Sequence, residues 1–285
     1  MSDTPYFIGI GAMRCGSTWI SQVLSEHPEV YIPASLKEVH FFDAFYKNSK
    51  RDKKERWNYG RGIEWYMNLL NEGGSHLKSG EITPNYLYDN EAPNLIKQDF
   101  PDVKIIVSLR DKVERSLSHF QFVKMHNYLE TTGDDLADYK KYDSDYHFSD
   151  YSHYEERLKR YHELFDDILV INFEDIKERP SIVCKQLYGF LGIEDEFQPA
   201  CLNKKMNKSR GKRSDFLYEV FKKTRKKVKK NRGLVKVSNA TGFTNVFKFL
   251  NRLNLSEKKE VSDDLKEYVE GLFAASDVKE KSNQI

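Results

Sequence analysis

The chain has 285 residues, and its 46 Lys or Arg against 44 Asp or Glu give a formal net charge of +2. A chain of this length buries about three quarters of its unfolded surface in one large domain or two small ones. The low net charge excludes a protein that binds polyanions with its whole surface, so an anion site has to be local. Its three cysteines, Cys15, Cys184 and Cys201, match no zinc spacing and indicate no disulfide framework.

The first residues lack the basic and apolar regions of a signal peptide. No apolar run approaches the ~18 residues that span a bilayer. If Met1 is the natural start, and with cysteines that favour a reducing compartment, we expect a soluble, cytoplasmic protein.

Short apolar runs predict buried strands at 6–11, 105–109 and 168–173, and a weaker pattern predicts a fourth at 77–82. Because these runs show no polar alternation, we expect a parallel sheet that is covered on both faces. Helical patterns begin near Gly16, follow the run at 105–109 and precede the run at 168–173. The alternation predicts a three-layer α/β fold with a central parallel sheet flanked by helices, extended by C-terminal helices.

Basic residues are concentrated late in the chain, with 14 Lys or Arg and two acids between 204 and 232. Apolar residues at helical spacing predict a basic amphipathic helix there. Its basic face is a solvated surface, a contact for an acidic glycan or a contact for anionic lipid at 212–232. We predict a last helix from Ser256, as its N-cap, to Phe273. The whole chain, 1–285, is expected to be one domain with a core at 5–211 and a basic helical extension at 212–285.

The stretch GAMRCGST at 11–18 resembles a phosphate-binding loop, G-x-x-x-x-G-K-[ST], with Ser17 in place of the lysine. It follows a predicted strand and opens a predicted helix, so its backbone N–H groups converge on one anion, phosphate or sulfate. The missing lysine argues against an ordinary ATPase or GTPase. The nearest basic residue is Arg14, and Arg110 after the second apolar run indicates another anion. The alternative is a tight turn with a solvated Arg14.

Several ordered segments resemble sulfotransferases that use 3′-phosphoadenosine 5′-phosphosulfate (PAPS). The sequence RCGSTW at 14–19 resembles their 5′-phosphosulfate loop, with Arg14 in place of the usual lysine. Arg110 and Ser118 resemble the pair that grips the 3′-phosphate. The segment KEVHFFD at 37–43 is similar to glycan sulfotransferases, especially those acting on heparan sulfate, and to their bacterial relatives. GEITPNY at 80–86 resembles the next block, and NKSRG at 207–211 the loop that closes over the cofactor.

The resemblance implies PAPS as donor, 3′-phosphoadenosine 5′-phosphate (PAP) as product and no metal. The transferred sulfonate carries a single negative charge, which also makes a metal less necessary. The cofactor-binding residues it implies are Arg14, Cys15, Gly16, Ser17, Thr18, Trp19, Arg110, Ser118, Lys208, Arg210 and Gly211. For Trp19, packing in the core is the alternative to a contact with adenine. For Arg110, it is an ion pair with Asp111 or Glu114.

Sulfuryl transfer by in-line attack needs a group that removes the proton of the acceptor hydroxyl, and such base catalysis is worth about 10²- to 10⁴-fold. The resemblance implies Glu38 as this base and Arg14 as the cation at the leaving oxygen. His40 is an orienting partner or a substitute base, or else a packed structural histidine. Glu38 and His40 point alike if their segment is extended.

We therefore expect a PAPS-dependent sulfotransferase whose acceptor is a hydroxyl on a carbohydrate or glycoconjugate, with no nucleic acid as partner. Ile82 stands where the heparan sulfate enzymes often have a lysine, and the acceptor pocket is expected in loops at 45–74 and 131–149. Two alternatives remain. One is a nucleotide-dependent phosphotransferase with a degenerate loop, and the other is a noncatalytic protein that binds polyanions.

Overall fold

The computed structural model describes residues 5–36, 38–46, 54–55, 58–74, 77–126, 128–202, 211–212, 255–256 and 260–282. The predicted cofactor contacts of Lys208 and Arg210 lie outside the described residues. So does the basic helix predicted at 212–232, except for its first residue.

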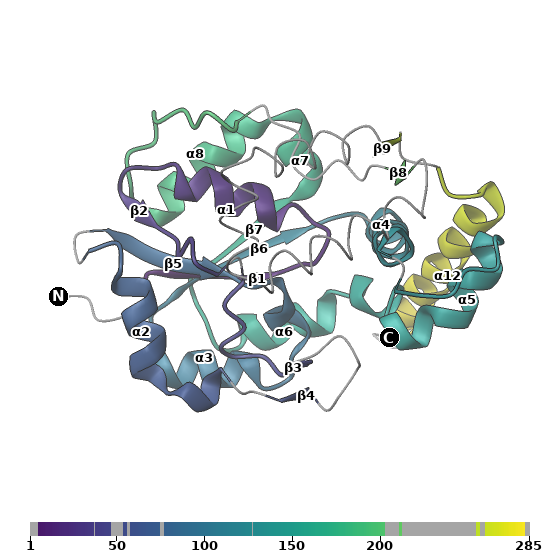
Figure 1. Ribbon diagram of the computed structural model, residues 1–285, viewed down its shortest axis with the longest axis horizontal. Coiled ribbons are helices and arrows are strands. Elements are labelled where there is room, and N and C mark those ends of the chain that lie inside the picture. Colours follow the sequence, from purple (N-terminus) through teal and green to yellow (C-terminus); the bar gives the residue numbers. More distant parts are fainter. Residues whose placement is uncertain are drawn as a thin grey trace, which may run out of the picture.

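A five-stranded sheet with the order β2-β5-β1-β6-β7 forms the centre of the molecule (Figure 1). All of its paired neighbours are parallel. The strands are β1 (Phe7–Gly11), β2 (Val30–Tyr31), β5 (Lys78–Ile82), β6 (Lys104–Leu109) and β7 (Ile168–Asn172). The four predicted strands are confirmed. The two-residue β2 was not predicted, because a run so short has no periodicity to detect.

Helices cover both faces of the sheet, as predicted (Figure 1). One face carries α1 (Ser17–Ser25), α7 (Phe173–Glu178) and α8 (Pro180–Leu191), and the other carries α2 (Ile63–Asn71), α3 (Ala92–Asp99) and α6 (Glu155–His162). Each face has its own buried cluster of apolar side chains. Short elements stand between the larger ones in the chain: η1 (Tyr59–Arg61), η2 (Pro84–Tyr88), η3 (Asp150–Ser152), and β3 (Phe45–Tyr46) with its antiparallel partner β4 (Lys54–Glu55).

A third apolar cluster lies beside the sheet, where α4 (Lys112–Met125), α5 (Asp135–Tyr146) and α12 (Asp263–Ser282) pack together (Figure 1). Leu265, Val269 and Phe273 of α12 are buried in it. The last helix therefore packs against the rest of the fold. The segment at 131–149, which we expected to be a loop, contains α5 instead. Its N-cap is Asp134, whose carboxylate accepts from two backbone N–H groups.

The predicted N-cap of the last helix is wrong. Ser256 lies in β9 (Leu255–Ser256), which pairs antiparallel with β8 (Gly211–Lys212). The helix begins at Asp263, where the N–H of Leu265 donates to the hydroxyl of Ser262 at 3.4 Å. Both serines precede a helical pattern, and only the pairing of the chain around Ser256 distinguishes them.

The apolar run at 168–173 also predicted too much burial. β7 is an edge strand of the sheet, and the side chain of Val170 is 45% exposed.

The three cysteines are free and buried, which confirms that the chain contains no disulfide. Among the described residues, no helix is both long and apolar enough to cross a membrane. The cytoplasmic location stays a prediction.

Close contact between β1 and β5 depends on a glycine. A Cβ atom added at Gly80 would lie 2.5 Å from the carbonyl oxygen of Phe7 and 2.6 Å from its ring. We predict that Gly80→Ala lowers the free energy of unfolding by about 1–3 kcal/mol, because backbone and ring have to shift. Gly189→Ala in α8 is the matched control, since nothing lies within 4 Å of the added methyl.

The control should stabilise the protein by up to about 1 kcal/mol through helix propensity. Urea unfolding of both variants measures the difference. Equal effects of the two substitutions would contradict this account of the β1–β5 contact.

Candidate active site

The site lies at the carboxyl edge of the sheet, around the end of β1. From β1 the chain passes through α1 to β2 and β5, which lie on one side of β1 in the sheet. It then crosses to β6, which lies on the other side of β1. In open α/β sheets, a crevice forms at such a point, outside the carboxyl ends of the strands. The loop at 12–16, Thr83 after β5 and Arg110 after β6 all lie at this edge.

The loop at 12–16 leads from β1 into α1. Gly16 is the N-cap of α1, with φ 92°. A Cβ atom there would lie 2.9 Å from Cδ1 of Ile176 and 3.1 Å from the ring of Phe173, so a glycine is needed. Ser17 and Thr18 form the first turn, where backbone N–H groups have no intrahelical partner. As predicted, the loop presents the start of a helix at the sheet edge, which is suited to an anion.

Two of the predicted residues meet beside this loop. The Nε of Arg14 donates to the hydroxyl of Ser118 at 3.3 Å, although the two residues are 104 positions apart. The Arg14 guanidinium also lies 4.7 Å from the ring centre of Phe122. α4 thus holds Arg14 from one side, through residues one turn apart.

Arg110 follows β6 and lies over the ring of Phe173, 4.7 Å from its centre. Its Nη2 forms an ion pair with Glu114 at 2.7 Å, which is one of the alternatives that the sequence left open. Its Nε is buried and has no hydrogen-bond partner in the described part of the chain. A buried guanidinium N–H without an acceptor costs free energy, and a bound phosphate oxygen would satisfy it.

The positive charge around the loop is only partly compensated. Burial, followed by the charge of Arg110, lowers the pKa of Arg14 to about 10, so Arg14 remains protonated at neutral pH. Arg115 is fully buried and donates to the hydroxyl of Ser152 and to the carbonyl of Phe148. Within the described ranges, no carboxylate pairs with Arg14 or Arg115. An anion at this position therefore meets three arginines, of which only Arg110 is paired with a carboxylate among the described residues.

Cys15 and Trp19 have little exposed surface. Burial raises the pKa of the Cys15 thiol to about 11, and its Sγ lies 3.7 Å from the hydroxyl of Tyr154. Only the backbone of Cys15 is therefore suited to hold an anion. Trp19 is 4% exposed in the core, where its Nε1 donates to the carbonyl of Leu202 at 3.4 Å. A contact of Trp19 with adenine stays a prediction, while its packing in the core is observed.

The second group of predicted residues lies in the segment at 38–43. The Nε2 of His40 lies 3.4 Å from a carboxylate oxygen of Glu38, and its Nδ1 lies 2.9 Å from a carboxylate oxygen of Asp43. The extended conformation, which would make the two side chains point alike, is not observed, because His40 has φ 52°. The two predicted side chains meet through this left-handed residue and not through strand alternation.

Asp43 is a functional candidate that the sequence analysis missed, although it lies in the quoted segment. Burial lowers the pKa of His40, but hydrogen bonds to Asp43 and Glu38 outweigh this effect and raise it to about 10. The ring is then an imidazolium at neutral pH and has no free lone pair for a proton. This favours an orienting role for His40 over that of a substitute base.

One short helix, η2, contacts both the loop at 12–16 and the segment at 38–43. The hydroxyl of Tyr88 accepts from the N–H of Met13 at 3.3 Å, and the hydroxyl of Tyr86 accepts from the N–H of Phe41 at 2.9 Å. Ile82, at the end of β5, points away from them and packs beneath α1. A Cβ atom at Gly9 would lie 2.7 Å from it. The side chain at position 82 is therefore part of the core.

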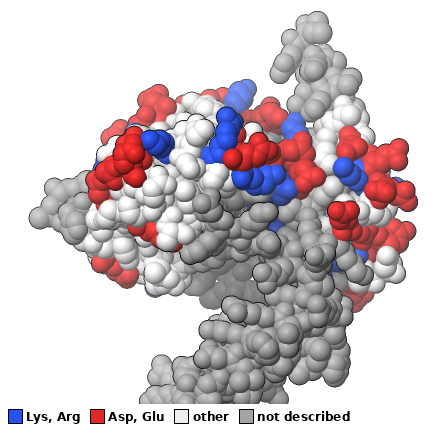
Figure 2. Space-filling model, turned by 90° about the horizontal axis from the view of Figure 1, so that it is seen from above, with Lys and Arg blue, Asp and Glu red and all other residues white. Residues whose placement is uncertain are grey.

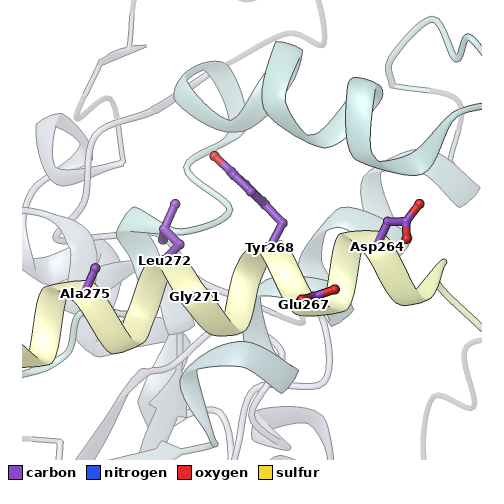
Figure 3. Close-up of a pocket in the computed structure, with 6 residues that line it drawn as sticks. All are labelled: Asp264, Glu267, Tyr268, Gly271, Leu272 and Ala275. Atoms are coloured by element: carbon purple, nitrogen blue, oxygen red, sulfur yellow. The ribbon is translucent and has the colours of Figure 1, made fainter.

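Gly211 was predicted to contact the cofactor and lies in β8, where its backbone pairs with Ser256. Two hollows lie on the described surface. One, of about 880 Å³, includes Arg110, Asn172 and Phe273 in its lining and adjoins the sheet edge. The other, of about 620 Å³, is lined by α12 alone, where Tyr268 points toward a neighbouring helix (Figure 3). Tyr268 there packs on Tyr139 of α5 at 6.2 Å, and the hollow contains none of the predicted site residues.

Charge is unevenly distributed on the face that carries α7 and α8. Figure 2 shows basic side chains near the middle of this view, and acidic side chains both among them and toward the two ends. The net charge of +2 thus coexists with an uneven distribution of charge on the described surface.

Comparison with known proteins identifies the family. The model of the sulfotransferase domain family matches residues 5–241, which is most of the chain. The chain belongs to this family. A crystal structure of a sulfotransferase from Alicyclobacillus acidocaldarius is similar over 82% of this chain and 96% of that one, with 25% identity and a TM-score of 0.60.

Two curated relatives match shorter regions of the chain. It is 36% identical over 122 residues to the membrane-associated sulfotransferase kil1 of Dictyostelium discoideum, covering 41% of this chain and 23% of that protein. It is 31% identical over 116 residues to the human heparan sulfate glucosamine 3-O-sulfotransferase 6, covering 41% of this chain and 30% of that protein. The matches thus span less than a third of these relatives' own lengths.

The contact between His40 and Asp43 predicts a titration. We expect Asp43→Asn to lower the pKa of His40 from about 10, because the variant removes the closer of its two carboxylate partners. NMR titration of the imidazole signals measures the change. Asp175→Asn, which removes a half-buried carboxylate on α7 that pairs with Arg179, is the control and should leave His40 unchanged.

The stabilisation from protonated His40 is complete below its ordinary pKa of 6.5 and is lost as the pH rises through about 10. The difference in unfolding free energy between the wild type and Asp43→Asn should therefore shrink over that range. A difference that grows with pH would contradict this assignment.

Proposed function

We propose that the protein is an enzyme that transfers the sulfuryl group of PAPS to a hydroxyl of a carbohydrate or glycoconjugate by in-line attack. One observation carries the proposal: η2 holds a cationic phosphate-type loop and a carboxylate–histidine–carboxylate group at the same edge of the sheet. The membership of the sulfotransferase domain family supports it.

The residues around the loop fit PAPS. When bound, PAPS supplies an activated sulfuryl group whose leaving group is a phosphate. Arg110 and Ser118 would hold the 3′-phosphate. The buried Nε of Arg110 has no acceptor among the described residues, and Ser118, which accepts from Arg14, keeps its own hydroxyl proton to donate. The first turn of α1 and Arg14 would hold the 5′-phosphosulfate and stabilise negative charge at the leaving oxygen. The absence of a metal requirement is part of the proposal.

In this proposal Glu38 accepts the proton of the acceptor hydroxyl. The His40 imidazolium, held by Asp43, contacts the carboxylate of Glu38 and limits its orientations. A fixed carboxylate that reaches the acceptor hydroxyl satisfies the geometric requirement for a general base.

A glycan acceptor is supported by relatives that act on heparan sulfate, according to their names. The buried position of Ile82 argues against an acceptor contact from that residue, so the acceptor would be held by other side chains. Contact of the basic segment at 212–232 with a glycan or with anionic lipid stays a prediction.

Calorimetric titration with PAP in the absence of metal tests the donor site. We predict micromolar binding, weakened about 10- to 100-fold in Arg110→Ala, because charge-assisted hydrogen bonds to a phosphate are lost. Arg179→Ala is the matched control, since Arg179 is an exposed arginine that also pairs with a carboxylate one turn away. Tight binding of ATP with magnesium and none of PAP would favour the phosphotransferase alternative instead.

Glu38→Gln tests the base. We predict that it lowers kcat by about 10²- to 10⁴-fold and leaves the affinity for PAP unchanged. The assay follows ³⁵S from labelled PAPS into desulfated heparan sulfate and unsulfated chondroitin, with Glu178→Gln on the surface of α7 as the control. Salt-sensitive binding of these chains with no transfer in the wild type would favour the noncatalytic alternative.

A further inference from the structure

We propose that Glu81 is a positioning residue that holds the segment at 38–43 in its active shape through the hydroxyls of Thr83 and Tyr86. The inference rests on the proposed function, because the segment carries the base Glu38. It concerns a residue that touches neither the acceptor nor the cofactor site in our assignment.

Glu81 is the penultimate residue of β5, and its side chain is 1% exposed. Its carboxylate accepts three hydrogen bonds: from Thr83 Oγ1 at 2.6 Å, from the hydroxyl of Tyr86 at 2.5 Å and from that of Tyr66 at 3.3 Å. In the described part of the chain, no lysine, arginine or histidine forms an ion pair with it. A buried carboxylate surrounded by hydroxyls and without a cation is expensive, so it needs an explanation beyond packing.

Two of these hydroxyls also accept hydrogen bonds from the backbone of the segment at 38–43. Thr83 Oγ1 accepts from the N–H of Val39 at 2.9 Å and from that of His40 at 3.3 Å. The hydroxyl of Tyr86 accepts from the N–H of Phe41 at 2.9 Å. Three consecutive backbone N–H groups, centred on His40, are thus held by oxygens whose protons point at Glu81.

The orientation of these hydroxyls explains why residue 81 is a carboxylate. A hydroxyl has two lone pairs and one proton. Both lone pairs of Thr83 are used by the backbone, so its proton needs an acceptor. The hydroxyl of Tyr86 accepts one backbone N–H and is fully buried, so its proton also needs an acceptor. Only a group that accepts at both oxygens satisfies the two hydroxyls together. An ionised carboxylate does so, whereas an amide or a protonated carboxyl has a donor at one of the two positions.

Burial raises the pKa of Glu81 to about 7, although the hydrogen bonds from Thr83 and Tyr86 act in the opposite direction. The carboxylate is therefore ionised, and accepts from both hydroxyls, above about pH 7, and the tests below are made at pH 8. The charged groups that face it are Asp43, which raises this pKa, and His40, which lowers it. The charge of His40 thus acts on the carboxylate of Glu81, which in turn helps to hold the backbone of His40. The left-handed conformation of His40 is unfavourable for a residue with a side chain, and these hydrogen bonds stabilise it.

Glu81→Gln tests the proposal, because it keeps the shape of the side chain and places a donor at one of its two acceptor positions. Hydrogen exchange of the apo protein, measured at the amides of Val39, His40 and Phe41, should become about tenfold faster. With labelled PAPS and desulfated heparan sulfate, kcat should fall about 10- to 100-fold, while KM for PAPS and the affinity for PAP stay within about twofold. Thr83→Val should reproduce both effects.

Tyr66→Phe is the matched control. It removes the third hydroxyl donor to Glu81, but this hydroxyl holds no backbone N–H of the segment, and the variant keeps the ring stacked on Phe41 at 4.5 Å. We expect amide exchange and kcat close to those of the wild type, even if the free energy of unfolding falls. Unchanged exchange in Glu81→Gln, or equal effects of Glu81→Gln and Tyr66→Phe, would overturn the proposal.

If the wild type transfers no sulfuryl group, the proposed function falls, and with it the catalytic part of this inference. The exchange rates do not depend on turnover and still decide whether Glu81 holds the segment. If the wild type is active and Glu38→Gln is not, a fully active Glu81→Gln overturns only the role of Glu81.

Discussion

Parallel strands bring the ends of β1, β5 and β6 to the same edge of the sheet, and every functional candidate depends on this arrangement. The loop before α1, Thr83 and Arg110 each follow one of these strands. Residues far apart in the chain therefore meet, as Arg14 and Ser118 do. The arrangement also creates a difficulty, because it gathers buried charges that have no water to solvate them.

The protein resolves this difficulty in different ways on the two sides of η2. On the loop side, Arg14 and Arg115 have no carboxylate partner among the described residues, which leaves positive charge for an anionic ligand. On the other side, Glu38 and Asp43 share one imidazolium, and Glu81 is satisfied by hydroxyls. The separation suits a reaction in which one side stabilises a leaving phosphate while the other removes a proton.

Sequence patterns predicted the parts of this arrangement that are encoded locally. Apolar runs located four of the five strands, and the spacing of Gly11, Gly16 and Thr18 located the loop. Patterns could not predict contacts that depend on tertiary structure. The left-handed backbone at His40, the carboxylate of Asp43 on its ring and the hydroxyls around Glu81 all arise from the packing of the 38–43 segment on η2. Ser256 misled the prediction of the last helix for the same reason, because β9 pairs with β8.

A crystal structure of the protein with PAP tests the central claim most directly. The account predicts the 3′-phosphate on Arg110 and Ser118, the 5′-phosphate at the first turn of α1 beside Arg14, and the Glu38 carboxylate facing the open side of that phosphate. PAP bound in the hollow along α12, or at the sheet edge with no contact to Arg14 and Arg110, would contradict it.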